Sequence, residues 1–203
     1  MDEVVAAVER IRREYEGFVA TNFLSYPDDR DVFPANRNEF YRHKEVQEGQ
    51  PTASREWVQQ ELSTLDKIVA PFHIPRDFAF FLSYYGGIKI KIDGYEFSIF
   101  GIGLVETGGL QSLLQDFGGE PTFKDGWQDV GDMFLRRERA EGGWNTINFR
   151  MSLSDAVRYG AIFTSGINAP YVWDAAVEDL LCVAESFSAW LDRVAAHDWA
   201  PFL

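Results

Sequence analysis

The stretch that decides the fold is Ile74-Pro-Arg-Asp-Phe-Ala-Phe-Phe-Leu-Ser-Tyr-Tyr-Gly-Gly87, which carries the signals of a short helix and of both its ends. Pro75 suits the first helical turn, where its missing N–H needs no partner, and Asp77 places a negative charge at the positive end of the helix dipole. Gly86 predicts a left-handed residue that ends the helix. The apolar face is formed by residues at helical spacing: Phe78, Phe81, Leu82 and Tyr85.

Two amphipathic helices are predicted before this stretch. The first has the apolar face Val4, Val8, Ile11, Tyr15 and Phe18. The second follows a possible cap at Ser54, ends before Pro71, and has the apolar face Val58, Leu62, Leu65 and Val69. Residues 26–53 between them are rich in proline and mixed charge, and predict a long irregular excursion. The predicted organisation is therefore an N-terminal helix and irregular extension over residues 1–54 and a main domain over residues 55–203.

After the double glycine the sequence predicts an antiparallel sheet. Residues 88–92 and 95–99 alternate apolar and polar side chains around Asp93-Gly94, which is typical of a hairpin with a type I′ turn. A helix is predicted over residues 110–117, and a strand near residues 132–136. Further short strands are predicted at residues 146–150, 161–164, 171–174 and 180–184. Ser186 predicts the cap of a last helix. The expected fold is α+β, with a central antiparallel sheet of about six strands flanked by helices.

Charge excludes some classes of partner. The chain of 203 residues has 32 acidic against 19 basic residues, a net charge of −13, so its field repels nucleic acids and anionic membranes. The acidity either keeps the protein soluble or attracts a basic protein partner. The first twenty residues are too acidic for a secretory signal, and the single cysteine, Cys182, cannot form an internal disulfide. A cytoplasmic location is expected.

The residues do not predict a catalytic, cofactor or metal site. The three histidines, His43, His73 and His197, are scattered, and no HExxH or paired-cysteine motif occurs. The run Gly101-Ile-Gly103-Leu-Val-Glu106 departs from a dinucleotide fingerprint at Glu106, where the phosphates need a glycine. An enzyme or small-ligand protein is supported only by the aromatic content. We therefore expect a protein that is not an enzyme.

One cluster is a candidate binding surface for a basic protein. It combines acidic residues with one aromatic side chain: Asp116, Glu120, Asp125, Trp127, Asp129 and Asp132. A cluster of negative charges raises the association rate of a positively charged partner, and the aromatic ring adds area that is buried on binding. The alternative is an acidic loop whose Trp127 packs back onto the core.

Three segments resemble the SUKH superfamily, which contains fungal cell-wall-synthesis regulators and many bacterial immunity proteins. The first is Ile74-Pro75-Arg-Asp77-Phe78 through Phe81-Leu82 to Gly86-Gly87. The second is Tyr171-Val-Trp173-Asp174, and the third is Leu181-Cys-Val-Ala-Glu-Ser186-Phe187-Ser-Ala-Trp190-Leu191. The match covers residues 55–196, and it is weak through residues 118–144. Two departures are Tyr85, where the family often has a polar residue, and residues 1–54, which exceed the usual length.

The resemblance implies a SUKH-like α+β fold that works by binding another protein. Bacterial members of the family resemble antidotes that bind and neutralise a toxin, often a nuclease. An acidic antidote is attracted to a basic toxin domain. The first hypothesis is therefore an immunity protein. The second is an intracellular regulatory or scaffold protein that recruits its partners through the N-terminal extension.

Overall fold

A computed structural model describes residues 2–15, 19–22, 55–92, 95–102, 113–114, 123–135, 145–164 and 180–198. The predicted excursion over residues 26–53, the turn at Asp93-Gly94, the strand at residues 171–174 and residues 199–203 lie outside this part of the chain. Of the helix predicted at residues 110–117, Leu113 and Leu114 are described, and both are helical.

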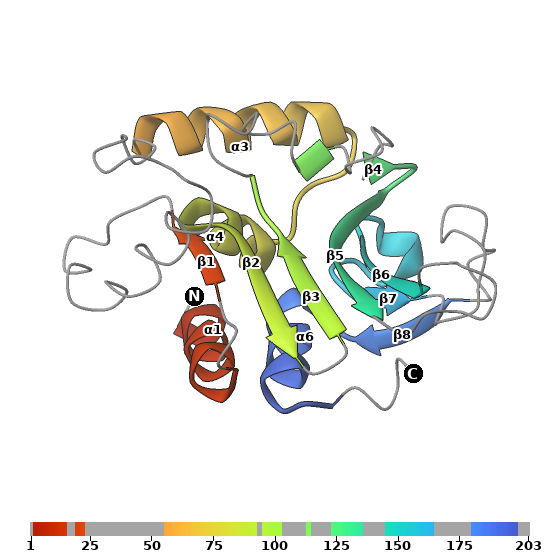
Figure 1. Cartoon of the computed structure of the whole chain (residues 1–203). Coiled ribbons are helices and arrows are strands. Elements are labelled where there is room, and N and C mark those ends of the chain that lie inside the picture. The colour runs from red at the N-terminus through yellow and green to blue at the C-terminus, as the bar shows by residue number, and fades with distance from the viewer. Residues whose placement is uncertain are drawn as a thin grey trace.

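The fold is α+β, as predicted, and its sheet is antiparallel throughout the described pairings (Figure 1). The described residues form eight strands, in the order β1-β2-β3-β5-β6-β7-β8, with β4 paired to β5. The sequence predicts about six, and β1 and β4 are the described strands that it does not predict. The strands are β1 (Val19–Asn22), β2 (Tyr85–Ile92), β3 (Tyr95–Phe100), β4 (Phe123–Lys124), β5 (Trp127–Leu135), β6 (Asn145–Ser152), β7 (Ile162–Thr164) and β8 (Leu181–Ala184).

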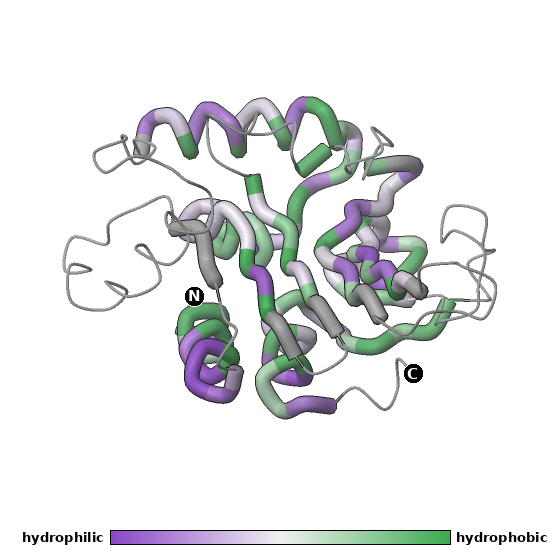
Figure 2. The backbone as a smooth tube through the Cα atoms, viewed as in Figure 1, coloured by the Kyte–Doolittle hydropathy of each residue, from purple (hydrophilic) through white to green (hydrophobic). Residues whose placement is uncertain are grey.

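The helices are α1 (Asp2–Glu14), α3 (Arg55–Val69), α4 (Arg76–Tyr84) and α6 (Phe187–Ala195), with a 3₁₀ turn at Asp155–Val157. Figure 1 shows α4 and α6 behind β2 and β3, and α3 across one end of the sheet. Hydrophilic and hydrophobic residues alternate along α3 in Figure 2, which is the amphipathic pattern that predicted it. The described residues of the apolar face predicted for the first helix are buried in α1 and just after it, and α6 also buries an apolar face: Phe187, Trp190, Leu191 and Val194.

The helix α4 ends differently from the prediction. It stops at Tyr84, and Tyr85 is already extended, with φ −120° and ψ 125°, as the first residue of β2. The prediction that Gly86 ends the helix in a left-handed conformation is therefore wrong. The double glycine lies within β2 instead, and the φ of 139° at Gly87 favours glycine. The backbone at Gly101 comes close, since a Cβ there would lie 2.3 Å from the carbonyl carbon of Gly86.

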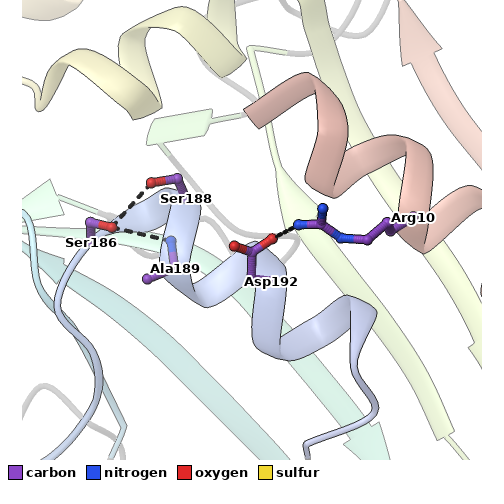
Figure 3. Close-up of polar contacts among 5 residues, drawn as sticks. All are labelled: Arg10, Ser186, Ser188, Ala189 and Asp192. Carbon is purple, nitrogen blue, oxygen red and sulfur yellow. Dashed lines mark hydrogen bonds and ion pairs between the residues drawn. The ribbon is translucent and has the colours of Figure 1, made fainter. Parts of the chain in front are cut away.

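The N-terminal helix belongs to the main core. Its apolar residues join the buried cluster formed by α4, α6 and the sheet. The Tyr15 hydroxyl donates a hydrogen bond to the Val194 carbonyl at 2.7 Å, and Arg10 pairs with Asp192 across α1 and α6 (Figure 3). In addition, β1 pairs with β2. Residues 2–15 and 19–22 thus pack with segments that follow residue 54, so the core contains residues from both parts of the chain.

Aromatic rings join α4 and α6 to each other and to the sheet. Phe187 lies 4.8 Å from Phe78 and 5.1 Å from Phe81, measured between ring centroids. On the sheet side, the Trp190 ring lies 5.6 Å from Phe97 and 5.2 Å from Phe149. The first and third segments that carry the SUKH resemblance therefore meet in one aromatic core.

Candidate functional site

The structure separates the acidic cluster predicted from the sequence. Asp116 and Glu120 lie outside the described residues. Asp125 is exposed in the turn between β4 and β5, where its φ is 53°. Trp127, Asp129 and Asp132 lie on β5. Their surroundings decide which of these side chains can meet a partner.

An irregularity in β5 places two of the acidic residues on the same face of the sheet. Residues three apart in a regular strand point to opposite faces. The register of β5 shifts between Asp129 and Gly131, so Asp129 lies opposite Arg150 and Asp132 opposite Asn148, two alternate residues of β6. The only signal for this in the sequence is Gly131, a glycine inside a strand.

Asp129 is held in a buried ion pair. Its Oδ1 lies 3.0 Å from Nε of Arg150, and the two residues are 8% and 4% exposed. Desolvation lowers the pKa of Arg150, and the charge and hydrogen bond of Asp129 oppose this change. Breaking a buried pair leaves a charge without compensation. Asp129 therefore has a structural partner within the chain and differs from the exposed carboxylate that the sequence suggested.

Trp127 is half-buried. Its ring stands edge-on to Phe163, with centroids 5.3 Å apart and an interplanar angle of 89°. This is a favourable aromatic arrangement. The ring packs on a side chain of β7, which lies beyond β6 in the sheet, so only part of it faces solvent.

An open pocket of about 600 Å³ lies between the starts of α4 and α6 and the turn before β7. Its lining comes from three segments that are distant in sequence: Pro75, Arg76, Asp77, Tyr159, Gly160, Glu185 and Ser186. No pattern in the sequence connects the three segments of this pocket. Asp77 and Glu185 lie in the two separate segments that resemble the SUKH superfamily, and Tyr159 lies in no motif.

Asp77 holds the two helix starts together. Its Oδ1 accepts the N–H of Phe78 at 2.9 Å, and its Oδ2 accepts the N–H of Ser188 at 2.9 Å. Ser186 caps α6 as predicted, because its hydroxyl accepts the N–H of Ala189 at 3.1 Å (Figure 3). One carboxylate thus satisfies backbone donors of both helices.

The exposed side of the pocket combines an aromatic ring with several charges. Burial raises the pKa of Tyr159 above its ordinary value of 10.0, and Asp155, Asp77 and Asp66 raise it further. Arg158 Nη1 lies 3.0 Å from Glu185 Oε1. The ring therefore lies near three carboxylates, with the Arg158–Glu185 ion pair at the edge of the same pocket.

In the described part of the chain, no group of three or more His, Cys, Asp or Glu side chains could hold a metal ion. No helix there is long and apolar enough to cross a membrane. Comparison with protein-family models, with curated proteins and with solved structures finds no match.

Proposed function

We propose that this protein is a non-enzymatic binding domain that neutralises a basic toxin domain, such as a nuclease, as bacterial immunity proteins do. The observation that carries the proposal is the net charge of −13. Charge complementarity accelerates the capture of a partner and can raise association rates by about 10- to 1,000-fold. An acidic surface also resembles the phosphate backbone that a nuclease binds. Fast capture matters for an antidote, because the toxin acts until it is bound.

The SUKH resemblance motivates this proposal, and two of the segments that carry it lie in the described core. The stretch from Ile74 to Gly87 and the stretch from Ser186 to Leu191 carry two parts of the resemblance. In the folded chain they contact each other through Asp77 and Ser188 and through the ring of Phe187. These two parts of the resemblance thus lie together at the joint between α4 and α6.

The experiment begins with the gene order. The gene of this chain should directly follow a gene for a large secreted toxin. The C-terminal domain of that toxin should co-purify with the full chain. The complex should weaken as salt rises from about 50 to about 500 mM, because screening shortens the range of the attraction. A neighbouring toxin whose domain does not bind at low salt would refute the proposal.

The scaffold hypothesis needs a different experiment from a simple truncation. Deleting residues 1–53 would remove Val4, Ile11 and Tyr15 from the core, so lost binding could follow from unfolding. Replacing residues 26–50 with a glycine-serine linker of equal length leaves α1 and β1 in place. If the extension recruits a regulatory partner, this variant should lose the partner and keep the melting temperature. Unchanged binding would contradict recruitment through residues 26–50.

A further inference from the structure

Tyr159 presents an aromatic ring to the open pocket. The side chain is 42% exposed, and the residues on either side of it have positive φ angles, 53° for Arg158 and 83° for Gly160. The Gly160 N–H donates to the Ser152 carbonyl at 2.7 Å, which ties this turn to β6. A ring on an anchored turn loses little conformational entropy when a partner covers it.

A negatively charged ligand would meet an occupied position in this pocket. The starts of two helices attract anions, since their first N–H groups lack partners within the helix. Here the carboxylate of Asp77 already accepts N–H groups from both α4 and α6. A phosphate or carboxylate from outside would therefore be repelled by Asp77.

A positively charged group already binds at the edge of the pocket. The guanidinium of Arg158 lies 3.0 Å from the Glu185 carboxylate, and both side chains are mostly exposed. Exposed pairs of this kind contribute little stability, so a cation from a partner can replace Arg158. Arg76 also lines the pocket, and its positive charge repels an incoming cation. A partner cation must therefore be attracted by the Tyr159 ring as well as by the Glu185 carboxylate.

We infer that this pocket receives an arginine or lysine side chain of the basic partner, placed on the ring face of Tyr159 and paired with Glu185. A cation over a tyrosine ring is attracted by the negative face of the ring. Asp155 and Asp66 add to the negative field around Tyr159. The inference rests on the proposed function, because it specifies how the acidic protein recognises its basic partner.

The first experiment uses small probes with the full chain. N-acetyl-arginine amide should shift the backbone amide resonances of Tyr159, Gly160 and Ser186 in a nitrogen-15 NMR titration. The Tyr159→Ala and Glu185→Gln variants should each bind it about three- to tenfold more weakly, whereas Tyr159→Phe keeps the ring and should bind like the wild type. Ile68→Ala, at a side chain that is also 42% exposed but does not line the pocket, is the matched control.

Two results would overturn the inference. One is equal binding of the arginine probe by the wild type and by Tyr159→Ala. The other is N-acetyl-glutamate amide shifting the same resonances, which would make the pocket an anion site. The toxin domain then separates the two proposals. If the toxin domain binds the wild type and Tyr159→Ala equally, the pocket inference fails and the proposed function stands. If the toxin domain binds neither protein while the arginine probe binds the wild type, only the proposed function fails.

Discussion

Asp77 is the residue whose substitution tests the joint between α4 and α6. Alanine removes both acceptors for the N–H groups of Phe78 and Ser188. A hydrogen bond to a charged group contributes about 1.5–3 kcal/mol, and the half-buried position of Asp77 favours the lower end of that range. Alanine recovers about 0.5 kcal/mol through its higher helix propensity. The Asp77→Ala variant should therefore be less stable by about 2–3 kcal/mol.

The Asp77→Asn variant tests whether both side-chain oxygens of Asp77 contribute to stability. The amide keeps one acceptor oxygen, so this variant should lose about half as much stability as Asp77→Ala. Urea unfolding followed by tryptophan fluorescence and circular dichroism gives the free energy of unfolding, and the m-value should stay unchanged. Asp66→Ala on the exposed face of α3 is the control and should change stability by less than about 0.5 kcal/mol. If Asp77→Ala unfolded with the same midpoint as the wild type, Asp77 would not hold the two helices.

Three other substitutions test the core by urea or thermal unfolding. Phe81→Ala should destabilise by about 3–5 kcal/mol because its ring is fully buried; a fully stable variant that lost partner binding would place Phe81 in an interface instead. Gly131→Ala should destabilise by about 1–3 kcal/mol or more, since its Cβ would lie 2.8 Å from the Trp190 ring; a melting temperature equal to that of the wild type would contradict this contact. Tyr15→Phe should cost about 1 kcal/mol through the lost bond to Val194, and no measurable change would mean that this bond does not help hold α1.

The helices and the hairpin could be predicted from the sequence because their signals are local. The apolar faces of α1, α3 and α6 repeat at helical spacing, and their described residues are buried except for Leu62 of α3, which is partly buried. The Ser186 cap lies next to the helix that it caps. The pairing of residues 88–92 with 95–99 follows from alternation and a short turn. Each of these features depends on residues within one or two turns or strands.

The features that the sequence could not predict depend on contacts between distant segments. Gly86 has the local signature of a helix end, but it lies within β2. There the backbone of Gly101 approaches it closely. The sequence around Asp129 predicts a surface charge, but the fold pairs Asp129 with Arg150 of β6. The packing of α1 on α6 places the N-terminal helix in the core.

The candidate site shows the same limit. Four of the six predicted binding residues are described, and β5 carries three of them, but the strand irregularity and Arg150 change what they present to solvent. The pocket beside Tyr159 unites α4, the turn before β7 and the start of α6. No spacing in the sequence connects these three segments, so only the tertiary structure brings Tyr159 and Glu185 together.

Growth rescue tests the central claim most directly. The C-terminal domain of the neighbouring toxin is expressed in cells with and without the full chain. We expect the toxin domain alone to stop growth and co-expression of this acidic protein to restore it. Continued growth arrest, with the chain folded and in excess over the toxin domain, would contradict the proposal that this protein is its antidote.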